Sequence, residues 1–289
     1  MARGKIKIRL QGHEKFVLRD GWLNKGIMLI EHNPFVFQGQ DAPDIFGLGN
    51  NMVKSLRYWL KAYNLIEEKG TKGVFLTDIA KTIVKYDKYF EDIFTIWILQ
   101  SNIAKNIGEA TTWYMFFNCC DLDEFDKDEI IKCLKREIFK YTNGVPFAEQ
   151  SLKNDVDVLL NMYGKERGIS DPEDKNISPM VQLGLIKKAD GMYTKGHPDD
   201  RNIYEWNILY ELASLMKGQT SISIEALCTG EKSLSAIYQI SRITINEMLD
   251  KLNDMEYIRV DRTAGLDMVY KLRDLEQVEV AEMYYQSHR

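Results

Sequence analysis

The sequence is poor in cysteine and has no long hydrophobic run, and both shortages narrow the classes of protein it can represent. Its four cysteines, Cys119, Cys120, Cys133 and Cys228, include no CxxC pair. Their spacing therefore supports neither a zinc ribbon nor a disulfide scaffold and favours free thiols in a reducing cytosol. The longest apolar run, around Ile93–Leu99, is far too short to span a bilayer, and the first residues lack an apolar signal segment. We expect a soluble cytoplasmic protein with no membrane partner.

Common catalytic fingerprints are also missing. The sequence contains no P-loop, no GxGxxG after a strand, no GxSxG and no HExxH, which are typical of nucleotide-binding proteins, hydrolases and zinc proteases. It also shows no dense carboxylate cluster of the usual nuclease kind. We therefore expect no nucleotide and no organic cofactor.

The charge of the chain is unevenly distributed. The 289 residues carry a formal net charge of -5. Residues 1–88 hold 15 Lys and Arg against 9 Asp and Glu, residues 89–201 hold 14 against 20, and residues 202–289 hold 9 against 14. Only the N-terminal third therefore has the sign of charge that attracts phosphate.

The N-terminal third combines a strand, a helix and a hairpin in its pattern. The opening "KIKIRL" (residues 5–10) alternates charged and aliphatic residues, which predicts a half-buried strand. Apolar residues recur at steps of three and four over residues 50–63, which predicts an amphipathic helix. The following "LIEEKGTKGVFLT" is typical of a hairpin. A helix followed by a basic hairpin is the winged-helix arrangement.

The helix and hairpin pattern recurs at residues 178–196 and 245–272, with helices predicted over 86–164 and a linker at "GISDPEDKNISP". The unequal spacing favours duplicated modules over a solenoid. We predict a mainly α protein with small β-hairpins (α+β), in which multiple winged-helix modules are joined by a helical connector. We expect an N-terminal strand with a winged-helix DNA-binding module over 1–85, the connector with a second helix and hairpin unit over 86–200, and a C-terminal winged-helix module over 201–289.

The last module differs from the first in charge. Its predicted helix presents Glu247, Asp250 and Asp254, and these acids would repel phosphates. A scaffold or subunit-interface role is at least as favoured there. Two copies of the chain could therefore pair as a homodimer.

The first predicted helix has a second, basic face, with Lys54, Arg57 and Lys61 at helical spacing. Together with the net positive third and the basic hairpin, this face predicts contact with the phosphates of double-stranded DNA. An ordinary solvated helix face is the alternative, and "GLGNN" before the helix fits a helix cap better than a phosphate loop. The predicted DNA-binding residues are Asn50, Asn51, Lys54, Arg57, Lys61, Lys69 and Lys72.

The stretch "GHEKFVLRDGWLNKG" (residues 12–26) holds the parts needed for phosphodiester cleavage. His13 can accept a proton near neutral pH, and Arg19 can stabilise charge on a phosphate. Glu14 or Asp20 can hold Mg²⁺ or Mn²⁺ or orient water. We predict His13, Glu14, Arg19 and Asp20 as catalytic, with Glu14 and Asp20 as metal ligands. The alternative is structural: His13 and Glu14 anchor the strand's end through hydrogen bonds, Arg19 pairs with Asp20 or Glu14, and Trp22 belongs to the core.

A second acidic stretch, "DLDEFDKDE" (residues 121–129), also raises the question of a metal. It lacks the central glycine and the terminal glutamate spacing of a calcium loop. Acids at the start of a helix are favoured by the helix dipole. We therefore expect these acids to begin a helix rather than to bind a cation.

Two stretches, "GHEKFVLRDGWLNKG" and "LGNNMVKSLRYWLKAYNLI", resemble the paired N-terminal motifs of a family encoded beside DNA phosphorothioation genes, which includes the SspB-type DNA nickases. The likeness is strongest over residues 12–66. Two positions depart from the family pattern: Lys15 stands where a small hydroxyl residue is usual, and Asn50 replaces a lysine and so removes one phosphate contact. The matching positions are Gly12, His13, Glu14, Phe16, Leu18, Arg19, Gly21, Trp22, Leu23, Lys25, Asn51, Met52, Val53, Arg57 and Trp59.

The resemblance implies a bacterial protein that acts in DNA phosphorothioation and phage defence. In that scheme it works with a cysteine desulfurase, a sulfurtransferase and an ATPase, and it nicks one DNA strand to expose the phosphate that is modified. The catalytic residues proposed above follow from residue chemistry and not from the resemblance. A non-catalytic winged-helix adaptor or regulator that recruits partner proteins is the alternative function.

Overall fold

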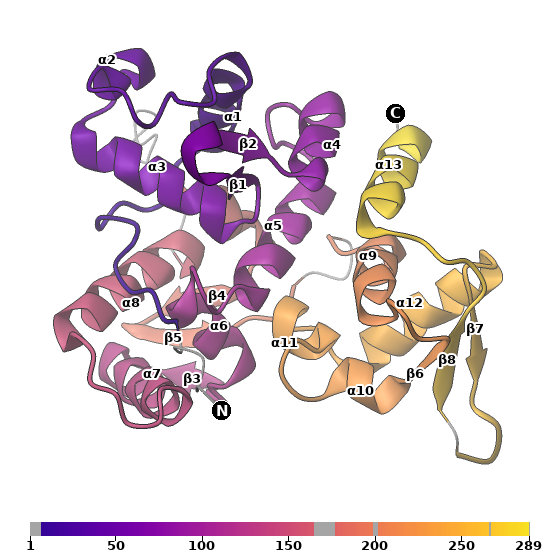
Figure 1. Ribbon diagram of the computed structural model, residues 1–289. Helices are drawn as coiled ribbons and strands as arrows, with labels where there is room; N and C mark the ends of the chain where they lie inside the picture. Colours follow the sequence, from indigo (N-terminus) through magenta and orange to yellow (C-terminus); the bar gives the residue numbers. More distant parts are fainter. Residues whose placement is uncertain (1–6, 165–176, 199–201, 266, 289) are drawn as a thin grey trace, which may run out of the picture.

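The computed structural model describes residues 7–164, 177–198, 202–265 and 267–288 (Figure 1). Helices dominate these ranges, and three small antiparallel sheets accompany them, so the α+β class predicted from the sequence is confirmed. The α-helices are α1 (Trp22–His32), α2 (Ala42–Phe46), α3 (Asn50–Ala62), α4 (Asp78–Tyr86), α5 (Ile93–Lys105), α6 (Thr111–Asn118), α7 (Lys127–Tyr141), α8 (Glu149–Gly164), α9 (Glu205–Leu215), α10 (Ile224–Cys228), α11 (Leu234–Tyr238), α12 (Arg242–Asp254) and α13 (Gln277–Ser287).

The strands are short and mostly belong to hairpins. They are β1 (Ile66–Glu68), β2 (Val74–Leu76), β3 (Glu124–Phe125), β4 (Ile186–Ala189), β5 (Met192–Lys195), β6 (Ser221–Ser223), β7 (Ile258–Asp261) and β8 (Met268–Lys271). Short 3₁₀ turns lie at Gly70–Lys72, Pro179–Leu183 and Thr263–Gly265. The hairpins β1–β2, β4–β5 and β7–β8 confirm the three that the sequence predicts.

Helix α5 forms the centre of the molecule (Figure 1). Every residue from Phe94 to Ala104 is buried, which matches a sequence whose apolar residues are distributed around the helix rather than along one face. Its buried polar side chains each have a partner: Gln100 donates to the Ile237 carbonyl at 3.0 Å, and Asn102 donates to the Tyr63 carbonyl at 2.9 Å. These bonds connect α5 to the N-terminal and the C-terminal parts of the chain.

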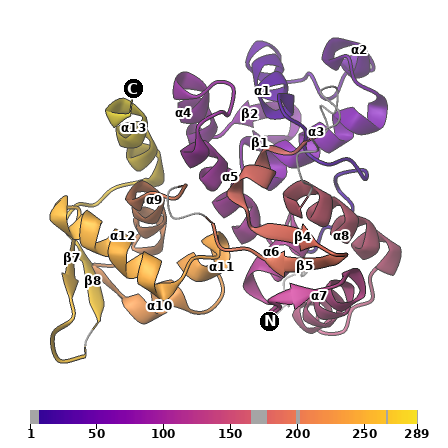
Figure 2. The same ribbon diagram turned by 180° about the vertical axis from the view of Figure 1, so that it is seen from behind.

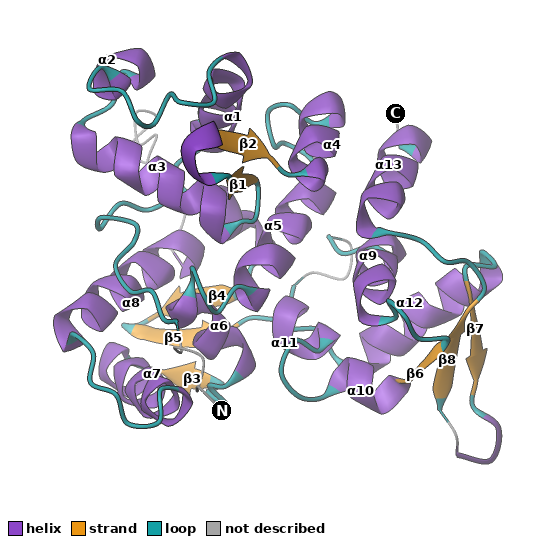
Figure 3. Cartoon of the chain, in the orientation of Figure 1, coloured by secondary structure: helices purple, strands orange, loops and turns teal. Residues whose placement is uncertain are grey.

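Helix α3 rests on α1 and α2 and leads directly into the β1–β2 hairpin (Figure 3). Its apolar positions Val53, Leu56 and Leu60 are buried, as their spacing predicts. The hairpin pairs Ile66 with Leu76. This packing fixes one face of α3 against the core and leaves the opposite face to solvent.

The other two sheets share one strand order. In each, the strand that comes first in the sequence pairs with the last strand of the following hairpin, which gives the orders β3-β5-β4 and β6-β8-β7 (Figure 3). A long helix precedes each hairpin: α8 before β4, and α12 before β7. Two of the three predicted helix and hairpin units therefore share a connectivity, while the first has a two-stranded sheet.

The last helix, α13, returns to the N-terminal part of the chain. It packs against α9 and α4, and both views show it beside α4 (Figures 1 and 2). Tyr284 stacks on Phe94 with ring centroids 3.9 Å apart. Tyr285 shares a 2.6 Å hydrogen bond with Thr95.

Two local expectations have clear outcomes. The predicted strand over residues 5–10 is wrong where it can be followed, because residues 7–10 are irregular and the Arg9 N–H donates instead to Thr111 Oγ1 at 2.9 Å. The acidic stretch begins a helix as expected: Asp126 caps α7 and forms a capping box with Glu129. Most of the predicted linker "GISDPEDKNISP" lies outside the described residues. Across the described ranges, no helix has the length and apolarity that a bilayer crossing requires.

Candidate functional site

The exposed face of α3 and the turn that follows Leu10 enclose a shallow hollow of about 330 Å³. Four of its lining side chains are cationic and two are acidic. Three of the cations, Lys54, Arg57 and Lys61, are those that the sequence places on one helix face. The hollow is lined by Arg9, Gly12, Glu14, Lys54, Arg57, Tyr58, Lys61 and Glu68.

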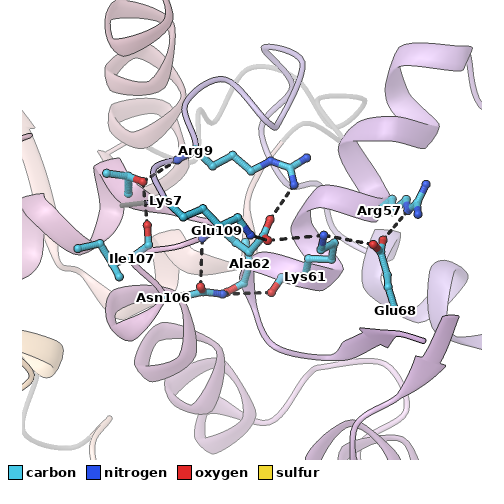
Figure 4. Close-up of polar contacts among 10 residues, drawn as sticks. Lys7, Arg9, Arg57, Lys61, Ala62, Glu68, Asn106, Ile107 and Glu109 are labelled. Carbon is cyan, nitrogen blue, oxygen red and sulfur yellow. Dashed lines mark hydrogen bonds and ion pairs between the residues drawn. The ribbon is translucent and has the colours of Figure 1, made fainter. Parts of the chain in front are cut away.

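Two carboxylates tie these cations into a network (Figure 4). Glu68, on β1, accepts from Arg57 Nε at 2.8 Å and lies 3.4 Å from Lys61 Nζ. Glu109, in the turn before α6, accepts from Arg9 Nη1 at 2.7 Å and also binds Lys7. Lys61 stands between the two carboxylates, with its Nζ 3.6 Å from Glu109. The network therefore joins the N-terminal segment, α3 and the hairpin.

The pKa values of both carboxylates are lowered by this network. Partial burial raises the pKa of Glu68, but the charges of Arg57 and Lys61 outweigh it and bring the pKa below 4.5. Burial likewise raises the pKa of Glu109. The hydrogen bond from Lys7 and the charges of Lys61 and Arg9 lower this pKa by more, so the net shift is downward. Both groups are ionised at neutral pH, where they compensate part of the positive charge.

Lys54 differs from its two neighbours on α3. Its side chain is exposed and lines the hollow, and it forms no ion pair with any described residue. Asn50 and Asn51 are exposed at the start of the same helix. Lys54 is therefore the cation on this face that is most available to an external anion.

The hairpin tip carries the remaining predicted contacts. Lys69 and Lys72 are both exposed there, so they extend the positive surface beyond α3. Lys69 is 3.4 Å from Glu67 and lies over the Phe75 ring. The sequence pattern thus placed the cations of α3 and the hairpin correctly on the surface, and their contact with DNA stays a prediction.

His13 has no exposed surface, although its sequence neighbours Gly12 and Glu14 line the hollow. Its Nδ1 accepts the Lys15 N–H at 3.0 Å, so the proton resides on Nε2, which donates to Asp155 Oδ1 at 2.8 Å. The rings of Trp59 and Trp113 enclose it, the first stacked at 5.9 Å and the second edge-on at 5.8 Å. Both nitrogens are occupied, so this geometry supports the structural alternative for His13 and not the role of a base that reaches a phosphate.

The other proposed catalytic side chains do not gather around His13. Arg19 lies over the Trp22 ring at 5.4 Å instead of pairing with an acid, and Trp22 is buried in the core. Asp20 is exposed and accepts the Gly21 N–H at 3.0 Å. Glu14 alone of the four lines the hollow.

The predicted Mg²⁺ or Mn²⁺ ligands, Glu14 and Asp20, are not brought together in the hollow, because Asp20 is absent from its lining. In the part of the chain that the structure describes, no three His, Cys, Asp or Glu side chains converge in a way that could hold a metal. Magnesium commonly takes one or two carboxylates and completes its shell with water and substrate phosphates. The side chains present therefore do not form a metal site by themselves.

Sequence reasoning missed the residues that are remote in the chain. Lys7 and Arg9 were assigned to a strand, and Glu109 and Asp155 gave no signal, because their partners are 100 and 142 positions away. Glu68 could have been found: it follows Lys61 by seven residues across a predicted helix and strand junction, where the two side chains can meet.

The fold and this surface define an α+β protein built from helix and hairpin units, in which the first helix, α3, has a cationic solvent-facing side. Its sequence matches DUF4007, a family described as "Protein of unknown function", over residues 10–285. The chain therefore belongs to the DUF4007 family.

Solved structures share this fold. A magnesium ion-bound SspB crystal structure is similar with a TM-score of 0.85 and 22% sequence identity, over 96% of this chain and 88% of that chain. A second SspB crystal structure gives a TM-score of 0.82 and 21% identity, over 96% of this chain and 86% of that chain. At these identities the likeness concerns the fold. No match was found among curated proteins.

Proposed function

We propose that this protein binds the phosphate backbone of double-stranded DNA through the exposed face of α3 and the tip of the β1–β2 hairpin. The observation that carries the proposal is the alignment of Lys54, Arg57 and Lys61 on one solvent-facing surface beside a hollow. Cations that track one face are the electrostatic footprint expected of backbone binding. Lys69 and Lys72 continue that surface.

We further propose winged-helix modules as the basis of this surface. In such modules a helix is followed by a hairpin, and the helix can enter a groove while the hairpin lies along phosphates. The order of α3, β1 and β2 supports this assignment for the first unit. The shared strand orders β3-β5-β4 and β6-β8-β7 support it for the other two.

The biological role that we infer is that of a DNA-binding component in a bacterial DNA phosphorothioation and phage-defence system. The motif resemblance over residues 12–66 and the SspB-like fold support this inference. The partners would then be a cysteine desulfurase, a sulfurtransferase and an ATPase. Nicking of one strand is the activity that the resemblance implies.

Nicking needs a water molecule activated beside a phosphate. Glu14 is the group in the hollow that can orient such a water, because it takes no part in the described ion pairs and lines the hollow. Arg9 and Lys54 line the same hollow and can hold a phosphate there. His13 would act as a positioning residue, because it holds the turn that carries Glu14.

A non-catalytic adaptor is the second candidate. The enclosure of His13 and the separation of Glu14 from Asp20 favour it, because of the two acids at the hollow Glu68 is already paired with Arg57 and Lys61 and only Glu14 is left for chemistry. An adaptor would use the same cationic surface to hold DNA while other proteins perform the chemistry.

Supercoiled plasmid distinguishes the two candidates. The purified protein is incubated with plasmid and Mg²⁺ or Mn²⁺, and DNA binding is measured alongside. The nickase predicts open-circular product that is lost in Glu14→Gln and retained in the control Glu31→Gln, an exposed acid of α1. Binding without conversion establishes the adaptor, and the absence of both binding and conversion contradicts both candidates.

A further inference from the structure

A second surface hollow, hereafter the α7 groove, lies between α7 and the loop that leads to α8. Its volume is about 460 Å³. Figures 1 and 2 place α7 at the end of its lobe away from α3, with α8 between them. None of its residues belongs to the surface proposed for DNA. The groove is lined by Lys132, Lys135, Arg136, Phe139, Lys140, Pro146, Phe147 and Glu149.

Aromatic and aliphatic groups form the floor of the α7 groove. Phe139 is 54% exposed although it sits in the middle of a charged helix face. The chain passes close beneath its ring at Gly144, where a Cβ would lie 3.3 Å from the ring and φ is +84°. Phe147 packs partly against the core, and Val145 is exposed next to it. An apolar patch with a polar rim is typical of a surface that binds another molecule.

Cations surround this floor. Lys132, Lys135, Arg136 and Lys140 follow one another at helical spacing along α7 and line the groove with one acid, Glu149. Glu149 pairs with Lys135. Glu137, which is not part of the lining, pairs with Arg136 and Lys140 at 2.6 and 3.0 Å. Lys132 has no ion-pair partner among the residues described, so the groove keeps a net positive charge.

We propose that the α7 groove binds an acidic segment of a partner protein, which inserts a large apolar side chain against Phe139 and Phe147. The carboxylates of the segment meet the cations of the rim, and charge complementarity selects the partner. A leucine or phenylalanine side chain loses no hydrogen bonds on this floor. A nucleobase can stack on an aromatic ring, but the aliphatic surface of Pro146 beside these rings suits a branched apolar side chain better than a flat base. The observations therefore favour protein over single-stranded nucleic acid.

Fluorescence anisotropy with the full chain tests the α7 groove. The probes are short synthetic peptides in which glutamate alternates with leucine or phenylalanine. Matched controls replace every glutamate with lysine or every apolar residue with serine. We expect the acidic apolar peptides alone to bind. We expect Phe139→Ala and Lys132→Ala each to weaken binding by about fivefold or more.

Two variants at another surface serve as controls for the fold. Tyr89 is 59% exposed and Lys88 lies over its ring, so Tyr89→Ala and Lys88→Ala remove similar groups and should leave peptide binding unchanged. Thermal unfolding confirms that Phe139→Ala still folds. The proposal is overturned if the serine or lysine peptides bind equally well, if Phe139→Ala binds like the unaltered chain, or if oligo-dT displaces the acidic peptide and binds more tightly.

Discussion

At the scale of single residues, His13 connects three distant parts of the chain through Asp155. The Asp155 carboxylate, 2% exposed, accepts the Gln11 N–H at 2.7 Å, His13 Nε2 at 2.8 Å and the Thr112 hydroxyl at 2.5 Å. The turn it holds contains Gln11, Glu14 and Lys15 in the left-handed region of φ, where each costs about 1 kcal/mol or more. A sequence shows that a histidine is present, but it does not show that this histidine will be buried and bonded to a carboxylate on α8.

Removal of the Asp155 carboxylate tests this structural role. Asp155→Ala leaves two buried donors, on His13 and Thr112, and the partly buried Gln11 N–H without a partner, so we expect the free energy of unfolding to fall by about 3 kcal/mol or more. Urea unfolding measures it. Asp157→Ala on the same helix is the control, because its carboxylate is half exposed and pairs with Lys127, and it should cost less than about 1 kcal/mol. Similar losses for the two variants would contradict the account of His13.

Glu68 limits the cationic surface of α3 by occupying Arg57 and Lys61. Because its pKa is lowered from 4.5, the pair persists at neutral pH, and its stabilisation is lost only as the pH falls below 4.5 through the lowered pKa. Glu68→Gln should release Arg57 and leave Lys61 with Glu109 alone. We expect DNA affinity near pH 7 to rise by about two- to fivefold, in keeping with exposed pairs worth up to about 1 kcal/mol.

A fluorescent duplex titrated with Glu68→Gln and Glu225→Gln measures this effect. Glu225 is the control because it is an exposed acid that pairs with Arg242 in the C-terminal unit, outside the surface proposed for DNA. Weaker DNA binding by Glu68→Gln would show that this carboxylate orders the surface for DNA instead of competing with it.

At the scale of elements, the sequence pattern predicted the helices and hairpins that depend on residues close together in the chain. The period of Val53, Leu56 and Leu60 predicted α3, and turn residues predicted the three hairpins. The third strands β3 and β6 were not predicted, because two or three residues carry no usable period and pair only when the hairpin is already in place. The alternation of charged and aliphatic residues at 7–10 led to a wrong strand prediction, because none of the described strands pairs with this segment.

Helices α3 and α12 occupy equivalent positions before a hairpin but differ in their charge. On α12, Arg242 pairs with Glu225 at 2.8 Å and contacts Asp267, and the hairpin's Arg262 pairs with Asp250 at 2.7 Å. Glu247 and Asp254 are exposed on the same helix. The candidate phosphate surface therefore belongs to the first unit.

This difference predicts unequal effects of removing one cation. Arg262→Ala should leave duplex affinity within about twofold, because Asp250 already compensates that charge. Lys54→Ala, which removes an uncompensated cation of the first unit, should weaken binding more. Filter binding of Arg262→Ala and Lys54→Ala to one duplex measures the two losses, and a large loss for Arg262→Ala would move the DNA surface to the C-terminal unit.

At the scale of the whole molecule, α13 holds the C-terminal part of the chain against the N-terminal part. Tyr284 donates to Asp92 at 3.0 Å and stacks on Phe94, while Tyr285 stacks on Tyr86 at 5.4 Å. Because α13 contacts both α9 and α4, it joins the C-terminal part to a helix far earlier in the chain; the bond from Gln286 to Tyr86 spans 200 positions. This return was not predictable from the sequence, because no local pattern in residues 277–287 indicates which distant helices they contact.

Tyr284→Ala tests the link. Loss of a buried aromatic ring should lower the free energy of unfolding by about 3 kcal/mol or more, and the C-terminal helix should become sensitive to protease. Tyr89 lies between α4 and α5 and its ring is exposed. Tyr89→Ala should therefore lower the free energy of unfolding by less than about 1 kcal/mol. Unfolding curves of the two variants that coincide would contradict the proposed role of α13.

The salt dependence of duplex affinity tests the central proposal, that the exposed face of α3 binds DNA phosphates, most directly. Lys54 is the variant of choice because it is exposed and unpaired among the described residues, so Lys54→Ala changes charge without disturbing the fold. Its control is Lys217→Ala, an exposed lysine that pairs with Glu276. We predict that affinity falls steeply with salt and that Lys54→Ala reduces the slope of log affinity against log salt by about one, while Lys217→Ala leaves it unchanged. An unaltered slope in Lys54→Ala would contradict the account.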